Sequence, residues 1–194
     1  MDTLPLPWTS GTWTTQPVDV HEDGPDLVVT AEEGSDAWRV TSYGFTHDTE
    51  HALVAPFPTD SAMEVVFTAG YSEQFDQAGL FVVSAADCWV KAGVEFADGH
   101  PQLGAVVTNP LSDWSSAPVD AWHGRRVRVR VSRSGDALTI RAGLDGDPLS
   151  LVRLAPFPRD ARAAAGPFTC APTRSGLVVR FHEWTTGPAD SGLH

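Results

Sequence analysis

The sequence lacks several features that would point to common classes of protein. It contains a single lysine, Lys91, and its 25 acidic side chains leave a formal net charge of -12. Because a nucleic-acid-binding surface is usually basic, this balance argues against nucleic acid as a partner. No apolar run approaches the roughly 20 residues that span a bilayer, and the N-terminus lacks the charged start and apolar run of a signal peptide. We therefore expect a soluble, cytoplasmic protein that does not contact the membrane.

Cysteine is also scarce, and motifs of common enzymes are missing. Cys88 and Cys170 both fall in predicted strands and could pair, but two buried free thiols suit a reducing cytoplasm better. The sequence shows no Ser-His-Asp order, no phosphate-binding loop and no Cys-His pair. It also shows no helix longer than a turn or two, no internal repeat and no domain linker. No cofactor is therefore expected, and an enzyme is not indicated by motif.

What the sequence does contain is a series of about a dozen short strands at regular spacing. Residues 125–132 (RRVRVRVS) alternate arginine and valine, which predicts a strand with one face in water and one in the core. Turn signals such as Asp145-Gly146 separate the strands. This pattern predicts an all-β fold, a two-sheet antiparallel sandwich. We expect one domain at residues 1–185 and a tail at 186–194 that frays.

The arginine row has two interpretations. Arg126, Arg128 and Arg130, with Trp122 nearby, could form a stripe that binds nucleic acid. The acidic net charge favours the other interpretation, a solvated arginine face on an outer strand.

The centre of the chain, residues 77–115, shows the clearest strand pattern. It predicts strands at 78–84, 88–96 and 102–108, joined by turns, and then a polar loop at 109–115. Side chains alternate across a strand, so the even-numbered residues of the second strand, from Val90 to Phe96, share an apolar face that belongs in the core. The opposite face carries Trp89, Lys91, Gly93 and Glu95.

Pairing these strands about their turns predicts which polar groups meet. Gln77 and Gln102 then fall beside Glu95 from either side, Val106 falls beside Lys91, and Thr108 falls beside Trp89. This face would be a polar floor with an aromatic wall, and the loop at 112–114 would supply a lip. Amide, ammonium and carboxylate groups hydrogen-bond hydroxyls, and an indole stacks on the apolar face of a sugar. The alternative is a solvated face whose charges contribute little.

These same residues resemble a known family. The strings Gln77-Ala-Gly-Leu, Trp89-Val-Lys-Ala-Gly-Val-Glu-Phe and Ser112-Asp-Trp-Ser are similar to the family labelled "regulation of enolase", within the concanavalin A-like lectin/glucanase superfamily. The similarity covers residues 5–185 and includes Trp38 to Phe45, with Asp48 and His51. It implies a jelly-roll sandwich, in which relatives bind sugars in the groove of one sheet. Such a fold hosts lectins, glucanases and interaction domains, so it does not fix the function.

A metal site is the weaker interpretation of a histidine-rich stretch. His47, Asp48, Glu50 and His51 carry metal-binding groups, but the stretch is predicted as a loop and no further ligand set follows at metal spacing. We therefore predict no metal. Instead, His51 with Asp48 is expected to join the groove from a neighbouring strand.

Catalysis by this groove would need a second group beside Glu95. The Glu-x-Asp-x-x-Glu pattern of the superfamily's glucanases is missing, because Glu95 is followed by Phe96 and a turn that contains Asp98. Glycosidases use two carboxylates, and Glu95 with Asp113 is the candidate pair. Lys91 beside Glu95 could instead assist a proton transfer.

The sequence thus favours recognition of a carbohydrate or similar polar metabolite in the groove of one sheet. Two alternatives remain open: a glycan-active or small-molecule enzyme that uses Glu95 with Lys91 or Asp113, and a module that binds an unidentified protein partner without a small ligand. The predicted ligand-binding residues are Gln77, Trp89, Lys91, Glu95, Asp113, Trp114, His51 and Asp48.

Overall fold

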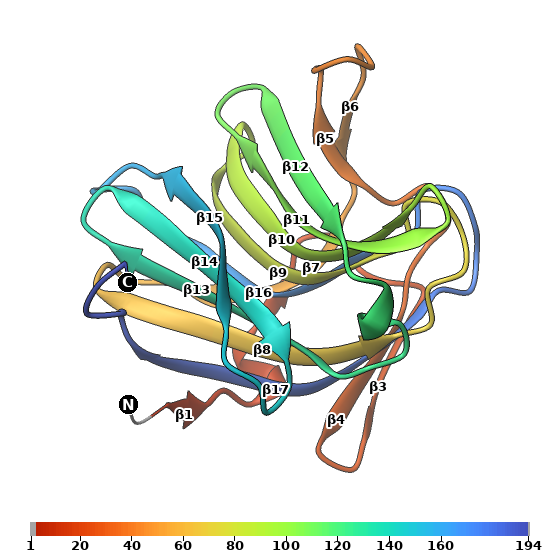
Figure 1. Ribbon diagram of the computed structural model, residues 1–194, viewed down its shortest axis with the longest axis horizontal. Coiled ribbons are helices and arrows are strands. Elements are labelled where there is room, and N and C mark those ends of the chain that lie inside the picture. The colour runs from red at the N-terminus through yellow and green to blue at the C-terminus, as the bar shows by residue number, and fades with distance from the viewer. Residues whose placement is uncertain (1–2, 194) are drawn as a thin grey trace.

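The computed structural model describes residues 3–193, which form two large antiparallel sheets (Figure 1). The first sheet has eight strands, in the order β15-β14-β13-β8-β17-β4-β3, and β1 pairs with β17 beside this path. Its strands are β1 (Leu4–Pro5), β3 (Asp19–Asp23), β4 (Asp26–Thr30), β8 (Ser61–Ala69), β13 (Val127–Ser134), β14 (Ala137–Leu144), β15 (Ser150–Pro156) and β17 (Val178–Pro188).

The second sheet has seven strands, in the order β12-β11-β10-β9-β16-β7-β2. Figure 1 shows β9, β10 and β11 bending along their length, which cups the face that points away from the first sheet. We call this face the outer face. The strands are β2 (Thr12–Trp13), β7 (His51–Pro56), β9 (Gln77–Ala85), β10 (Cys88–Ala97), β11 (His100–Thr108), β12 (Ser112–Pro118) and β16 (Ala164–Cys170).

A separate hairpin, β5 (Ala37–Arg39) and β6 (Thr46–Asp48), stands away from both sheets beside the outer face (Figure 1). Within residues 3–193 the helices are two 3₁₀ turns of three residues, η1 (Trp8–Ser10) and η2 (Asp120–Trp122). No helix in this part of the chain is long and apolar enough to cross a membrane. The predicted all-β, two-sheet antiparallel sandwich is confirmed.

The core between the sheets confirms the predicted alternation on β10. Val90, Ala92 and Val94 are buried in one cluster with Val65 and Val129 of the other sheet. Burying a side chain as large as valine contributes roughly 1.5–3 kcal/mol to stability. A shift in the register of β10 would expose these side chains and is therefore strongly unfavourable. Trp89, Lys91 and Glu95 are consequently held on the outer face.

The loop predicted at 109–115 is wrong in its second half. Residues 112–118 form β12, which pairs with β11 from Thr108↔Ser112 to Gln102↔Pro118. Ser112 is buried, but the rest of β12 is exposed. An exposed edge strand needs no apolar alternation, so its polar sequence resembled a loop.

The arginine row is not on an outer strand. β13 lies inside its sheet, between β14 and β8. Its valines are buried as expected, but its arginines are ion-paired rather than solvated: Arg128 contacts Glu64 at 3.1 Å and Arg130 contacts Asp190 at 2.9 Å. Carboxylates from neighbouring strands and from the C-terminal segment therefore neutralise this face.

The fraying tail expected at 186–194 is also wrong in its first part. β17 continues to Pro188, and the Asp190 carboxylate accepts hydrogen bonds from Arg130 and Arg141. His194, like residues 1–2 of the predicted domain, lies outside the described residues.

A row of glycines crosses the seven-stranded sheet: Gly79 pairs with Gly93, and Gly93 pairs with Gly104. The backbones approach so closely that a Cβ built on Gly93 would lie 2.1 Å from the carbonyl oxygen of Ala78. Because that obstacle is backbone, the strands would have to separate. The row therefore requires glycine at this crossing.

We expect Gly93→Ala to lower the free energy of unfolding by about 2 kcal/mol, the usual cost of forcing extra volume into packed structure. Gly70→Ala is the matched control, because its added methyl would meet nothing within 4 Å. That change should stay within about 0.5 kcal/mol. Urea unfolding of both variants measures the difference, and equal midpoints would contradict the close approach.

Candidate functional site

The strand register brings the predicted polar groups together on the outer face. Glu95 lies opposite Gln77 on β9 and opposite Gln102 on β11. Val106 lies opposite Lys91, and Thr108 lies opposite Trp89. The pairing predicted from the turns is therefore confirmed at all of these positions.

A cavity of about 320 Å³ lies between this face and the β5–β6 hairpin. It falls within the range of roughly 300–1,000 Å³ that is usual for small-molecule sites. Its floor is polar and its walls are largely aromatic. Its lining residues include Asp36, Trp38, Tyr43, Phe45, His47, Phe75, Gln77, Lys91, Glu95 and Trp114.

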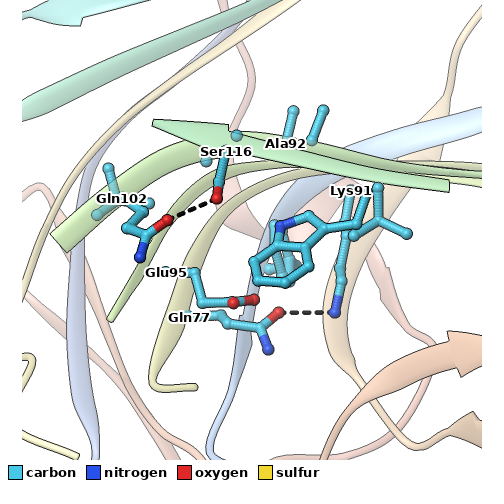
Figure 2. Close-up of a pocket in the computed structure, with 13 residues that line it drawn as sticks. Gln77, Lys91, Ala92, Glu95, Gln102 and Ser116 are labelled. Carbon is cyan, nitrogen blue, oxygen red and sulfur yellow. Dashed lines mark hydrogen bonds between the residues drawn. The ribbon is translucent and has the colours of Figure 1, made fainter. Parts of the chain in front are cut away.

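Lys91 is the centre of the floor and is almost fully buried. Its Nζ donates to Gln77 Oε1 at 2.7 Å, as Figure 2 shows, and to Asp36 Oδ1 at 2.9 Å. Asp36 Oδ1 also accepts from the backbone N–H of Ala37 at 2.8 Å and from Gln77 Nε2 at 3.4 Å. Three donors thus converge on one carboxylate oxygen, which fixes the loop before β5 to the outer face.

Burial alone would disfavour both charges of this pair, but their mutual attraction outweighs it. Asp36 raises the pKa of Lys91 against the effect of burial, and Lys91 lowers the pKa of Asp36 in the same way. The two groups are therefore an ammonium and a carboxylate at neutral pH. A lysine held as an ammonium is a hydrogen-bond donor, and it is unsuited to act as a nucleophile or a base.

Glu95 is in the opposite electrostatic situation. Burial raises the pKa of its carboxyl to about 7, because the attraction of Lys91 is offset by repulsion from Asp36 and Asp98, and no hydrogen bond contributes. Figure 2 shows the carboxyl beside the Gln77 amide, which separates it from Lys91. Glu95 is thus a half-buried carboxyl that can change protonation near neutral pH.

The hairpin supplies one wall of the cavity as a ladder of rings. The ring centroids of Trp38 and Tyr43 are 5.6 Å apart, those of Tyr43 and Phe45 are 5.4 Å apart, and those of Phe45 and His47 are 4.7 Å apart. Tyr43 and Phe45 remain 54% and 42% exposed. Trp114, on β12, is a further half-exposed ring of the lining, contributed by the far edge of the seven-stranded sheet.

Hydrogen bonds connect the hairpin to β12. The backbone N–H of Arg39 donates to Ser112 Oγ at 2.9 Å, and Ser112 shares a 2.8 Å hydrogen bond with Thr108 Oγ1 on β11. Trp38 Nε1 donates to the carbonyl of Thr41 at 2.9 Å, inside the hairpin itself. The two sources of aromatic wall are therefore joined through buried hydroxyls.

Four of the eight predicted site residues, Gln77, Lys91, Glu95 and Trp114, line the cavity. Trp89 does not, although it lies on the outer face. It is 4% exposed, its ring stacks on Phe81 at 5.5 Å, and it packs in a buried cluster with Trp38 and Phe168. Its position as an aromatic wall is wrong, because the hairpin covers this end of the sheet.

Asp113 points away from the cavity. Because residues 112–118 form a strand, Asp113 and Trp114 lie on opposite faces of it. The Asp113 carboxylate contacts Arg153 of β15 at 2.9 Å and is largely exposed. The strand geometry therefore does not bring together Glu95 and Asp113, the candidate pair of carboxylates.

His51 and Asp48 do not join the groove either. His51 is fully buried: its Nε2 accepts from the N–H of Glu32 at 3.0 Å, and its Nδ1–H donates to the carbonyl of Thr15 at 3.1 Å. Burial lowers the pKa of this imidazole, which favours the neutral form. Asp48 is exposed on β6 and outside the cavity lining. No group of three or more His, Cys, Asp or Glu in residues 3–193 is placed to hold a metal.

Comparison with known proteins places this structure in a family. A family model described as "Protein of unknown function (DUF1349)" matches residues 13–189. The chain belongs to the DUF1349 family. It is 38% identical over 187 residues to "Regulation of enolase protein 1" of Saccharomyces cerevisiae, covering 96% of this chain and 94% of that protein. It is 32% identical over 135 residues to an uncharacterized protein of Emericella nidulans, covering 65% and 68%.

Solved structures support the DUF1349 fold. A functionally unknown protein from Saccharomyces cerevisiae superposes with a TM-score of 0.89 at 37% identity, covering 95% of this chain and 99% of that one. A xylan beta-1,4-xylosidase from Bacillus halodurans superposes with a TM-score of 0.65 at 12% identity, covering 83% of this chain and 32% of that one. At such low identity the second match shows the fold alone, which is a two-sheet antiparallel sandwich.

In this DUF1349 chain, sequence reasoning missed most of the residues that line the cavity. Asp36, Tyr43, Phe45 and His47 were not among the predicted site residues, although Tyr43 and Phe45 belong to the stretch that carried the family resemblance. Asp36 lies in the loop directly before β5. Its partner Lys91 is 55 residues away, so no local pattern indicated the contact.

The two cysteines of this DUF1349 chain are both free. Cys170 is buried in the cluster that contains Trp89, and Cys88 is half-buried at the start of β10. The expectation of unpaired thiols is confirmed.

Proposed function

We propose that this DUF1349 domain binds a carbohydrate or a similar hydroxyl-rich metabolite in the cavity beneath the hairpin. The observation that carries the proposal is the combination, in one cavity of about 320 Å³, of a buried Lys91–Asp36–Gln77 floor and exposed aromatic walls. Sugar hydroxyls both donate and accept, which suits a floor of ammonium, amide and carboxyl groups. Aromatic rings cover the apolar face of a sugar ring.

The charge of the floor favours a neutral ligand over an anionic one. Lys91 and Asp36 compensate each other, so the remaining charge is that of Glu95. With a pKa of about 7, Glu95 makes the floor neutral or singly negative near neutral pH. An acidic sugar would meet like charge whenever Glu95 is ionised.

A second candidate function is supported by the same carboxyl. A general acid or base works best when its pKa is near the operating pH, and Glu95 meets that condition inside a cavity. Neither predicted partner is suited: Lys91 is held as an ammonium, and Asp113 lies on the other face of β12. An enzyme acting here would use Glu95 as the proton donor or acceptor beside the ionised Asp36.

Calorimetric titration and thermal unfolding with a sugar panel test the proposal. The panel contains glucose, galactose, mannose, xylose, N-acetylglucosamine, cellobiose, lactose and xylobiose, with glucuronate as the anionic comparison. At 100 times its dissociation constant, a bound sugar should add about 2.7 kcal/mol to the free energy of unfolding. Tyr43→Ala and Phe45→Ala should weaken binding about tenfold, because each removes an exposed ring of the ladder.

The matched control is Leu154→Ala, which removes an equally exposed apolar side chain from β15 of the other sheet. It should leave sugar binding unchanged. If no sugar of the panel binds to the folded protein, the proposal is contradicted. Binding of a protein partner at the exposed hairpin tip then becomes the favoured function. Conversion of a bound sugar that stops in Glu95→Gln would establish the enzyme instead.

The free cysteines also support a cytoplasmic location, which we propose as part of this function.

A further inference from the structure

Positive backbone φ angles at non-glycine residues occur mainly in the segments that wall the cavity. In the described part of the chain there are five such residues, and two of them, Asp60 and Asp98, are of a type that adopts this left-handed conformation more readily than most. The other three are Val40, Ser42 and Phe75. Val40 and Ser42 lie in the loop of the β5–β6 hairpin, and Phe75 itself lines the cavity. Strained backbone of this kind is typical of ligand-binding and active sites.

Phe75 carries the largest side chain of these three residues. Its φ angle is 68°, a conformation in which the Cβ of an L-residue lies too close to the following carbonyl oxygen. The residue is half-buried and lines the cavity, but it packs against neither of the apolar clusters formed by the described residues. Packing in the core therefore does not explain why the chain keeps this conformation.

Hydrogen bonds on both sides of Phe75 fix its backbone. The N–H of Phe75 donates to the carbonyl of Phe96 on β10 at 2.6 Å. The neighbouring carboxylate of Asp76 is fully buried and accepts from the N–H of Ser72 at 2.9 Å and from Nη2 of Arg174 at 2.7 Å. A strained conformation persists only where its surroundings enforce it, and these contacts do so.

The position of Phe75 along β10 places it across the floor from the hairpin. Phe75 is hydrogen-bonded to the residue that follows Glu95. Trp38 of the hairpin packs instead in the cluster that contains Trp89, which precedes Lys91 on the same strand. A ligand above Lys91 and Glu95 would therefore have the hairpin at one end and Phe75 at the other.

We infer that Phe75 contacts the ligand, and that the chain retains the strained backbone because it presents this ring to the cavity. This inference rests on the proposed function and adds to it an apolar contact at the end of the cavity opposite the hairpin. Such a contact would cover C–H groups of a sugar that the hairpin rings do not reach. The site would then gain affinity at a cost in the stability of the free protein.

Thermal unfolding of Phe75→Gly and Phe75→Ala without ligand tests the strain. Both variants lack the ring, but glycine adopts a positive φ angle freely and alanine does not. We expect the midpoint of Phe75→Gly to lie about 2–4 °C above that of Phe75→Ala, which reverses the usual order of these two residues. A midpoint for Phe75→Gly equal to or below that of Phe75→Ala would overturn the inference.

Calorimetric titration tests the contact, with the sugar of the panel that binds the wild type most tightly as the probe. Phe75→Gly and Phe75→Ala should both weaken binding about tenfold, because both remove the ring. The matched controls are Asp60→Gly and Asp60→Ala, at an exposed position of positive φ that is outside the cavity lining. They should leave the affinity unchanged.

The outcomes separate this inference from the proposed function. If the sugar binds Phe75→Gly and Phe75→Ala as tightly as the wild type, the inference is overturned and the proposed function stands. A loss of affinity in Phe75→Gly alone, or an equal loss in the Asp60 variants, also overturns it, because the loss would then report backbone freedom rather than a missing ring. Failure of every sugar to bind the folded wild type overturns both.

Discussion

Lys91→Met is expected to lower the free energy of unfolding by about 3 kcal/mol. The substitution removes the ammonium from a buried pair and leaves the Asp36 carboxylate and the Gln77 amide oxygen without their shared donor. Breaking one partner of a buried ion pair typically costs 3–5 kcal/mol, because the other charge remains desolvated. We expect the lower end of that range because Asp36 keeps 17% of its side-chain surface exposed.

Urea unfolding at pH 7 measures the change. Asp36→Asn in the Lys91→Met background should restore part of the stability, because it removes the unpaired charge. The control is Arg153→Met, which breaks the exposed ion pair with Asp113 and should cost less than about 1 kcal/mol. If Lys91→Met and Arg153→Met lowered the free energy of unfolding by the same amount, Lys91 would not be a buried charge. Because Lys91→Met is expected to destabilise the protein, a loss of ligand binding in this variant would not by itself report a lost ligand contact.

Glu95→Gln is expected to stabilise the protein at pH 8 and to have little effect at pH 4. Burial raises the pKa of this carboxyl to about 7 in the folded protein, against an ordinary value of 4.5. Between these values the folded state holds a proton that the unfolded chain has released, so the contribution of Glu95 to stability is lost as the pH rises. At about 1.4 kcal/mol per pH unit, the gain at pH 8 has an upper limit of about 3 kcal/mol.

The gain should be smaller than this limit, because Glu95 is only half-buried and solvent screens part of its charge. Thermal and urea unfolding from pH 4 to pH 8 measures the difference between variant and wild type. Glu22→Gln, which removes a charge from an exposed position on β3, is the matched control. A Glu95→Gln gain that is constant with pH, or a loss at pH 8, would contradict a protonated carboxyl in the cavity.

The outer-face register of β9, β10 and β11 could be predicted because local rules determine it. Short turns fix which residues pair, and the apolar side chains of Val90, Ala92 and Val94 fix which face is buried. Together these rules placed Gln77 and Gln102 on either side of Glu95. Nothing beyond strand alternation and turn length was needed.

The rest of the cavity could not be predicted because it depends on contacts between distant segments. Alternation does not reveal that the base of the hairpin packs against the outer face, and this is what buries Trp89 and brings Asp36 to Lys91. Alternation also cannot assign side chains to the two faces of a strand that was predicted as a loop. Once residues 112–118 were assigned to a loop, Asp113 and Trp114 could not be separated, although only Trp114 lines the cavity.

The hydrogen bonds from Arg39 to Ser112 and from Ser112 to Thr108 affect how ligands would exchange. They join the hairpin to the sheet edge, so the opening between the aromatic walls is set before a ligand arrives. A preformed opening removes the need for a closing step, so the association rates of related ligands should differ little. Discrimination between sugars would consequently be expressed in their residence times.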